Sequence, residues 1–318
     1  MEGGLLIDKP AGITSHDVVS RVRRFAGTRR VGHAGTLDPF ATGLLVVCVG
    51  TATRLVQFLT GLDKEYLATI RFGFATDTQD LTGKQMGPLT ASNGLSGGEI
   101  EKALSEFIGP QNQLPPMFSA KKVGGQRLYK AARSGREVDR APSLINVFSI
   151  CSLPGGAVMN ADGTLDWAVT VRCSSGTYVR TLAHDLGARL RVGAHLAALR
   201  RTGVGQFRIE QASTLDDLNA GSAAEDTGTG DGATSIRTPF LSPADLVSHL
   251  RSRRLDEVDA LRIRQGREIS SGELADGEIA DNVPVALLAE DGNLIAIGRH
   301  LATRKAIAPE VVLSAEGK

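Results

Sequence analysis

The stretch RVGHAGTLDPFATG, residues 30–43, places three glycines and a proline around a single acidic residue, Asp38. Glycines permit a tight backbone and the close approach of a ligand, and Pro39 fixes the backbone directly after the carboxylate. The apolar run at 44–49 that follows is typical of a stiff supporting strand. One aspartate in a glycine-rich loop is often only a turn residue or a cap. Spacing alone therefore leaves Asp38 open to two interpretations, a turn residue or a deliberately placed functional group.

The size and composition of the chain indicate a protein with a substantial core. Its 318 residues are many for one core, so two domains are expected. The hydrophobic fraction is 42%, and the longest apolar runs are too short to span a bilayer. The first residues lack the basic and apolar segments of a secretory or transit signal. Cys48, Cys151 and Cys173 are widely spaced, which argues against a disulfide framework or a structural zinc site. We therefore expect a cytoplasmic location.

The charges balance to a net +1, so an argument for a nucleic-acid partner depends on how they are distributed. Basic residues gather in three groups, which are Arg21, Arg23, Arg24, Arg29 and Arg30; Lys121, Lys122, Arg127, Lys130, Arg133, Arg136 and Arg140; and Arg189, Arg191, Arg200, Arg201 and Arg208. One such group is usually only a solvated face. Three of them, with the compensating acids elsewhere, permit a polyanion to bind on one side of a nearly neutral protein.

The first 215 residues alternate predicted helices and strands, without the glycine-rich fingerprints of nucleotide-binding folds. Capping signals and apolar periodicity predict helices at 14–25, 96–108 and 177–190. The second of these is expected to turn Ile100, Leu104, Phe107 and Ile108 inward. Alternation of apolar and polar side chains predicts strands at 66–72 and 167–173. This mixture indicates an α+β fold with a largely antiparallel sheet.

A change of composition marks the end of this part. Residues 219–236 read NAGSAAEDTGTGDGATSI, which is too small and polar to fold alone and is expected to be a linker. Beyond it, helices are expected at 241–250 and 255–264, followed by a hairpin. The hairpin joins 283–290 to 294–299 through Asp291-Gly292, a strong turn signal. Residues 239–318 are therefore expected to form a compact unit of their own.

Five motifs follow one another along the first 207 residues, namely GLLIDKPAGITSH at 4–16, GHAGTLDPFATG at 32–43, KEY at 64–66, SGTYVRTL at 175–182 and LRRTGVGQF at 199–207. Together they closely resemble the TruB family of tRNA pseudouridine synthases. The segment QLPPMFSAKK, which begins at Gln113, resembles the RNA-gripping insertion that distinguishes this family from its relatives. Gln206 departs from the family, which commonly has a proline there.

The resemblance implies the pseudouridine synthase fold, with a central mixed, largely antiparallel sheet and an active cleft across its middle. It implies a catalytic domain at 1–215 with the insertion at about 113–142. An acidic, glycine-rich linker follows at 216–238, and a PUA-like RNA-binding β domain at 239–318. An ordinary small β domain that only caps the enzyme is the alternative for this last part.

By this resemblance Asp38 is the catalytic residue that converts a uridine in the T loop of tRNA, position 55, to pseudouridine. The reaction breaks the N-glycosidic bond, turns the base and joins ring C5 to the sugar, and it requires no metal or other cofactor. Asp38 adds to ribose C1′, adds to the uracil ring or assists a glycal-like elimination, and the sequence does not choose among these routes. Its carboxylate needs a nearby cation in a partly dry pocket. Arg180 is expected in that role, with a surface arginine on a first helical turn as the alternative.

The resemblance also assigns residues that hold the RNA. The target base must leave the folded T arm, and stacking on an aromatic ring recovers part of the cost. Tyr66 is implied as the stacking platform and proton-moving catalytic residue, although an aromatic residue on an alternating strand is often only part of the core. Further substrate contacts are expected from His33, Lys64, Lys121, Lys130, Tyr178 and Arg200. A metal site at His33 is not expected, because no second His or Cys stands at ligand spacing.

Other functions remain possible on the residues alone. One alternative is a catalytically silent protein that binds or folds RNA and in which the Asp38 loop is only structural. Another is a pseudouridine synthase that acts on another RNA, for example within a guide-RNA particle. The insertion at about 113–142 favours direct recognition of tRNA by a monomer that needs no protein partner and no membrane.

Overall fold

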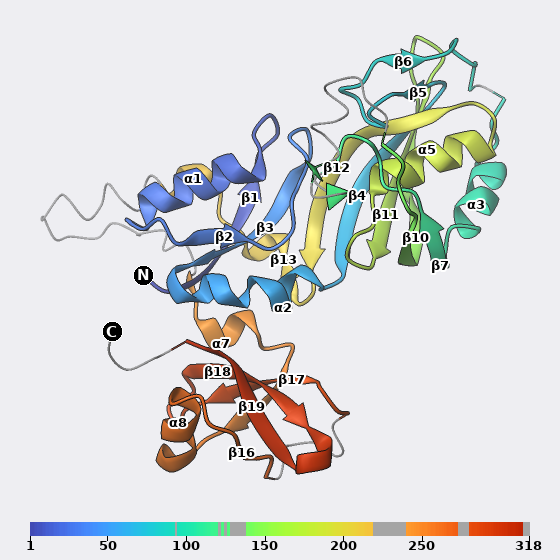
Figure 1. The fold of residues 1–318 in the computed structure, drawn as a ribbon. Helices are drawn as coiled ribbons and strands as arrows, with labels where there is room; N and C mark the ends of the chain where they lie inside the picture. The colour runs from blue at the N-terminus through green and yellow to red at the C-terminus, as the bar shows by residue number, and fades with distance from the viewer. Residues whose placement is uncertain are drawn as a thin grey trace, which may run out of the picture. The chain divides into compact units, whose positions relative to one another are not determined.

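The computed structural model describes residues 1–92, 94–119, 138–218, 240–272 and 280–313, and the backbone of 122–123 and 126–127. The chain forms two compact units, drawn as a ribbon in Figure 1. The first comprises Met1–Asp38, Leu44–Gly61 and Gly205–Lys318, and the second comprises Pro39–Gly43 and Leu62–Val204. The domain boundaries expected from the sequence remain a prediction, and the linker expected at 219–236 lies outside the described residues.

In the first unit, the N-terminal residues and a short later strand form part of a sheet that packs against one helix. The strands are β1 (Gly3–Lys9), β2 (Val31–His33), β3 (Thr42–Val49) and β14 (Phe240–Leu241), and the helix is α1 (Ser15–Phe25). Strand β1 lies between β14 and β3, and β2 pairs antiparallel with β3. The predicted capping box of Thr14 and Asp17 is confirmed at the start of α1. That helix buries its valines against the apolar side chains of β1 and β3.

The C-terminal part of the first unit is a five-stranded sheet with short helices. Its strands run in the order β15 (Arg251–Arg254), β17 (Pro284–Leu288), β18 (Leu294–Leu301), β19 (Ala306–Val312) and β16 (Ile269–Ser270). Strands β17 and β18 form the predicted hairpin. Helix α8 (Glu257–Arg264) packs on β18 and β19, whereas the helix expected at 241–250 is reduced to α7 (Pro243–Leu246). It is shorter because the chain turns at once into β15, which pairs parallel with β17.

The second unit contains the mixed, largely antiparallel sheet that the sequence analysis predicts. Its strands are β12 (Ala194–Val204), β4 (Lys64–Phe72), β11 (Leu165–Cys173), β10 (Ser143–Met159) and β7 (Gly109–Gln113), in this order. Neighbours among these strands pair antiparallel, and β12 also pairs parallel with the first residues of β3. Helices α3 (Gly97–Ser105) and α5 (Val179–Arg189) pack against this sheet and against each other (Figure 1).

Two further helix predictions need correction. Helix α3 ends at Ser105, so Ile108 lies beyond it and is 49% exposed instead of turned inward. Helix α5 begins at Val179 with Tyr178 as its N-cap residue, two positions later than the sequence suggests. Among the described residues, no helix is long and apolar enough to cross a bilayer.

Gly43 shows why the motif at 30–43 needs glycine at its end. Its φ of +102° lies in the region that side chains disfavour, and an added Cβ would lie 2.3 Å from the Arg201 carbonyl oxygen. The start of β3 can pair with β12 at this register only because Gly43 has no side chain.

Candidate active site

The Asp38 loop lies in the first unit, after β2, and is held immediately before the aspartate. The Ser15 hydroxyl accepts a hydrogen bond from the Leu37 amide at 2.9 Å and donates one to the Leu37 carbonyl at 3.1 Å. Ser15 and Leu37 are buried, and Asp38 is half-buried. The capping segment at 14–17 therefore does more than begin a helix, because it also fixes the backbone that presents Asp38.

Tyr66 lies in the second unit, buried on β4 opposite Arg201 of β12. The guanidinium of Arg201 is 1% exposed and is hydrogen-bonded to the Tyr66 hydroxyl. Burial lowers the pKa of Arg201, and Tyr66 opposes that shift. The Tyr66 hydroxyl therefore lies beside a buried cation. Arg201 is one of the third group of basic residues in the sequence, but its burial removes it both from a solvated face and from a patch that binds a polyanion.

Lys64 lies two residues before Tyr66 on the same face of β4 and is also buried. It donates a hydrogen bond to the Leu62 carbonyl. Burial, and then the charge of Arg201, lower the pKa of Lys64 from 10.5 to about 8. The Lys64 amine therefore loses its proton at a pH only slightly above neutral. An exposed lysine that binds phosphate keeps its charge at that pH.

Arg180, in the first turn of α5, is 3% exposed, so the alternative of a surface arginine is wrong. Its guanidinium donates to the carbonyls of Thr78 at 2.9 Å and Phe118 at 3.0 Å. The Asp80 carboxylate lies 3.5 Å from its Nη1 atom. Acceptors from two separate segments thus hold this side chain inside the second unit. The pairing of Arg180 with Asp38 remains a prediction.

Asp80 is a functional candidate that the sequence analysis missed. Its Oδ1 atom accepts from the Thr78 hydroxyl at 2.8 Å, and from the amide and hydroxyl of Thr82 at 3.0 and 2.6 Å. The side chain is 5% exposed, and its other oxygen faces Arg180. A signal was present in ATDTQDLTG, residues 75–83, because threonines on both sides of an aspartate are typical of local side-chain to backbone hydrogen bonding.

Gln113, the last residue of β7, is buried and bonds twice to the backbone of Tyr178. Its Oε1 atom accepts from the Tyr178 amide at 2.8 Å, and its Nε2 atom donates to the Tyr178 carbonyl at 3.0 Å. Tyr178 has no side-chain cap of its own at the start of α5. Gln113 therefore orients the tyrosine that the sequence analysis places in the pocket.

The remaining predicted residues lie in both units or outside the described ones. His33 ends β2 in the first unit and is half-buried. Arg200 is half-buried on β12 in the second unit, with Nη1 3.5 Å from the Thr42 hydroxyl. Lys121 and Lys130 lie outside the described residues. The structure thus forms two groups of candidate residues in the second unit. One is the KEY motif with Arg201, and the other is Tyr178 and Arg180 with Gln113 and Asp80.

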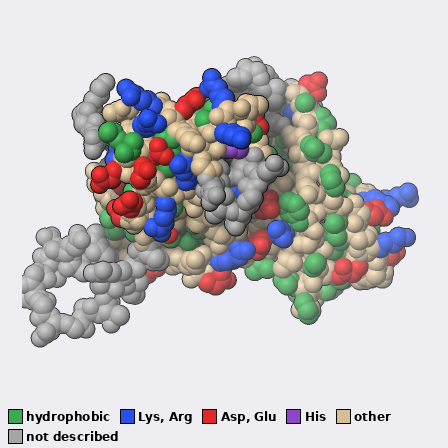
Figure 2. All heavy atoms as spheres, turned by 90° about the horizontal axis from the view of Figure 1, so that it is seen from below, with side chains coloured by type: hydrophobic (Ala, Val, Ile, Leu, Met, Phe, Trp, Pro, Cys, Tyr) green, Lys and Arg blue, Asp and Glu red, His purple; other side chains and the backbone are tan. Residues whose placement is uncertain are grey.

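The surface in Figure 2 shows basic side chains scattered among acidic and apolar ones on the face drawn. Part of the third basic group is also already engaged. Arg189 pairs with Glu106 at 2.7 Å, and Arg208 donates to the Gly205 carbonyl at 2.6 Å. Within the described ranges, no three His, Cys, Asp or Glu side chains gather as a metal site.

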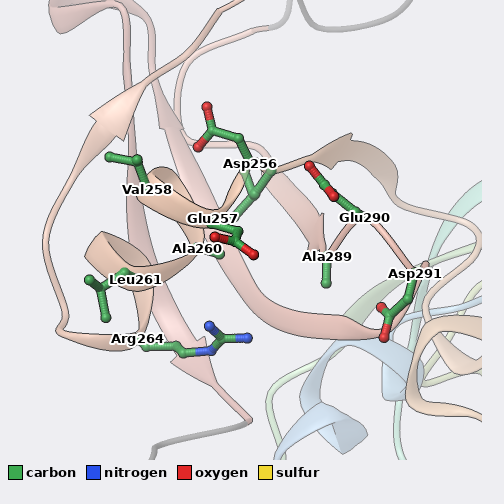
Figure 3. Close-up of a pocket in the computed structure, with 10 residues that line it drawn as sticks. Asp256, Glu257, Val258, Ala260, Leu261, Arg264, Ala289, Glu290 and Asp291 are labelled. Carbon is green, nitrogen blue, oxygen red and sulfur yellow. The ribbon is translucent and has the colours of Figure 1, made fainter.

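A hollow of about 620 Å³ lies in the C-terminal part of the first unit, between α8 and the turn after β17 (Figure 3). Its acidic lining residues are Asp256, Glu257, Glu290 and Asp291, and its basic one is Arg264. Four acidic residues against one basic residue disfavour phosphate, so this hollow does not fit an RNA backbone. None of the five sequence motifs contributes to it.

Comparisons with known proteins agree with the five motifs. Residues 23–179 match the model of the TruB family pseudouridylate synthase N-terminal domain, and residues 180–247 match that of the tRNA pseudouridylate synthase B C-terminal domain. The tRNA pseudouridine synthase B of Thermobifida fusca is 44% identical over 94% of this chain and 94% of its own length. That of Opitutus terrae is 50% identical over 69% of this chain and 88% of its own length.

Among solved structures, a chain of an H/ACA RNP bound to a substrate RNA containing 2′-deoxyuridine has a similar fold. It superposes with a TM-score of 0.74 over 99% of this chain and 86% of its own length, at 24% identity. At that identity the likeness concerns the fold alone.

Proposed function

Since this chain belongs to the TruB family of tRNA pseudouridine synthases, we propose that it modifies position 55 in the T arm of tRNA and uses Asp38 as its catalytic carboxylate. The chain is an isomerase that converts a uridine of tRNA to pseudouridine. The observation that carries the assignment of Asp38 is its loop, which has the family motif and is fixed at Leu37 by Ser15.

The reaction exchanges one bond of the base for another without net oxidation or reduction. The N-glycosidic bond to ribose C1′ breaks, C1′ joins ring C5, and C5 gives up its proton while N1 gains one. A carboxylate serves each of the three routes, since it can bond to C1′, bond to the ring or take up a sugar proton in a glycal-like elimination. Asp38 thus supplies the nucleophile or base, and the route remains open.

The other roles follow from groups in the second unit. Tyr66 stacks on the extruded base and accepts the C5 proton, supported by its hydrogen bond to the buried cation Arg201. Arg180 keeps the Asp38 carboxylate ionised, supported by its own burial and its anchoring to carbonyls of Thr78 and Phe118. Tyr178 lines the pocket on the far side of the base from Tyr66.

The RNA is held by further side chains of the family motifs and of the insertion at about 113–142. His33 and Arg200 contact the RNA near the extruded base. Lys64, buried on β4 beside Tyr66, serves substrate binding from within the pocket and not as a contact to a backbone phosphate. Lys121 and Lys130 bind phosphates of the T arm. The enzyme acts as a monomer in the cytoplasm, without a protein partner or cofactor, and its C-terminal residues 239–318 add RNA affinity as a PUA-like domain.

Asp38→Asn tests the central assignment, because it keeps the shape of the side chain and removes its charge. Tritium release from T-arm RNA labelled at uracil C5 measures turnover, and filter binding measures affinity. We expect release to fall by about 10⁴-fold or more while affinity stays within about threefold. Asp216→Asn, at an exposed aspartate, is the matched control and should release tritium at the wild-type rate. Substantial release by Asp38→Asn would refute the assignment. Binding of tRNA without any tritium release by the unsubstituted chain would favour an RNA-folding role.

A further inference from the structure

The root of the insertion at about 113–142, meaning residues 113–119 and 138–143 where it leaves and rejoins the sheet, is held together by contacts within the second unit. The insertion leaves the sheet after Gln113 and returns at Ser143, and these two residues are paired in register between β7 and β10. The Arg140 guanidinium, near the returning end, donates to the Pro115 carbonyl at 2.9 Å. Both ends of the insertion are therefore tied to each other close to the sheet.

Three hydrogen bonds connect the outgoing end of this root, residues 113–119, to the start of α5. Gln113 holds the amide and carbonyl of Tyr178 through one side-chain amide. Five residues further along, the Phe118 carbonyl accepts from Arg180 Nη2 at 3.0 Å. Gln113 and Arg180 are both 3% exposed, so water does not compete for these bonds.

This arrangement makes the position of Arg180 depend on the root of the insertion. A displacement of 114–119 moves the Phe118 carbonyl, and a displacement of Gln113 moves Tyr178, two residues before Arg180. A catalytic group misplaced by about 1 Å can cost about 100-fold in rate. Loss of the Gln113 bonds would therefore slow the chemical step without removing a group that touches the substrate.

We propose that Gln113 is a positioning residue that couples residues 113–119, the outgoing end of the insertion, to Arg180, so that RNA bound at this end also sets the first turn of α5. The inference rests on the proposed function, in which Arg180 serves the reaction. Gln113 itself contacts neither the substrate nor the reacting atoms. Its effect passes through the Tyr178 backbone and the Phe118 carbonyl.

The test uses the full chain and replaces Gln113 by methionine, which is similar in size but makes neither bond to Tyr178. Gln111→Met is the matched control, since Gln111 lies two residues earlier on β7 and bonds instead to the Phe107 carbonyl. Gln113→Glu keeps the acceptor for the Tyr178 amide but loses the donor, and it covers the case in which Gln113→Met does not fold. Single-turnover rates at saturating enzyme, tRNA affinities and amide hydrogen exchange over 178–189, with and without tRNA, are measured for each variant.

We expect the single-turnover rate of Gln113→Met to fall by about tenfold to 100-fold, with tRNA affinity within about threefold of wild type. In the wild type, tRNA should slow hydrogen exchange in the first turn of α5, and in Gln113→Met bound tRNA should not. Gln111→Met should behave as wild type in both respects. The losses of Gln113→Met and Arg180→Lys should be less than multiplicative in the double variant, because both act through one side chain.

A wild-type rate and unchanged exchange in Gln113→Met would overturn the coupling, and so would fully multiplicative losses with Arg180→Lys. The proposed function fails on a different result, namely wild-type turnover by Arg180→Lys or Asp38→Asn. If those two variants are impaired while Gln113→Met is not, only the coupling is wrong.

Discussion

Replacing Asp80 by asparagine removes one negative charge from the second unit while keeping the shape of the side chain. The Asp80 and Arg180 side chains are 5% and 4% exposed, and their closest charged atoms are 3.5 Å apart. At that distance, with an effective dielectric constant of about 20, their attraction is about 5 kcal/mol. Asparagine recovers part of it, since its oxygen still accepts from Thr82 and Arg180 keeps its carbonyl acceptors. We therefore expect the free energy of unfolding to fall by about 2–3 kcal/mol, less than the roughly 3–5 kcal/mol that follows when a buried charge loses its partner entirely.

The assay pairs urea unfolding with single-turnover tritium release at saturating enzyme. Asp166→Asn is the matched control, because it breaks an ion pair of the same unit, Arg71 with Asp166 at 2.6 Å, whose arginine side chain is 34% exposed. This pair is half-buried, so it should contribute less than the buried pair of Asp80 and Arg180, and the control should lose about 1 kcal/mol of stability. It should also keep its turnover within about twofold, whereas Asp80→Asn should slow about 10-fold to 100-fold because Arg180 loses its orientation.

A free energy of unfolding within about 0.5 kcal/mol of wild type, together with wild-type turnover of Asp80→Asn, would refute the role of Asp80 in holding Arg180. The Asp80 carboxylate would then be no more than the acceptor of a local turn. A loss of stability alone, with turnover intact, would leave Asp80 a structural residue and would remove it from the candidate site.

Three further predictions concern other groups. Tyr66→Phe keeps the ring and loses the hydroxyl, so turnover should fall by about 100-fold or more while T-arm binding is retained. Tyr66→Leu loses the ring as well, so it should lose turnover and also bind more weakly. A near-normal single-turnover rate for Tyr66→Phe would exclude the hydroxyl as proton acceptor. The pKa of Lys64 is lowered to about 8 in the folded chain. Between about pH 8 and 10.5 the folded chain has therefore released this proton, whereas the unfolded chain still binds it. The free energy of unfolding that this site contributes therefore rises with pH across that window. Lys64→Met should abolish this rise, so the free energy of unfolding of wild type relative to the variant, measured by urea unfolding, should increase by about 3 kcal/mol from pH 7.5 to 10.5. If the free energies of the two proteins change in parallel with pH, the lowered pKa is contradicted. Lys121→Ala with Lys130→Ala should weaken all tRNAs about equally and reduce the slope of log affinity against log salt by roughly two units, and an unchanged slope would place the RNA elsewhere.

Local signals account for the parts of the fold that were predicted correctly. The capping box of Thr14 and Asp17, the alternation along β4 and the Asp291-Gly292 turn each specify structure within a few residues of themselves. The structure confirms these elements because no distant contact opposes them. The helix expected at 241–250 failed for the opposite reason, since pairing of β15 with β17 outweighs the helical period there.

The site was predicted only where a motif carried it. Asp38, Tyr66, Tyr178 and Arg180 lie in recognisable motifs, and their roles stay predictions. The burial of Arg180 excludes the surface position that was its alternative, whereas the burial of Tyr66 fits both a pocket and a core residue. The supporting groups were missed because their contacts join distant parts of the chain. Asp80 meets Arg180 across 100 residues, and neither periodicity nor capping encodes such a contact.

The hydroxyl of Ser15 has a consequence for how natural variants of this chain should be interpreted. A serine in the first turn of a surface helix is normally a tolerant position, and most scales would score its replacement as mild. Here the hydroxyl is both donor and acceptor to Leu37, one residue before the catalytic candidate and 22 residues away in sequence. Threonine retains a hydroxyl but adds a methyl group to a site that is only 2% exposed, and alanine leaves the buried Leu37 amide without this acceptor. A genetic screen that selects for loss of modification in a stable, RNA-binding protein should therefore recover alleles at codon 15 alongside those at codon 38.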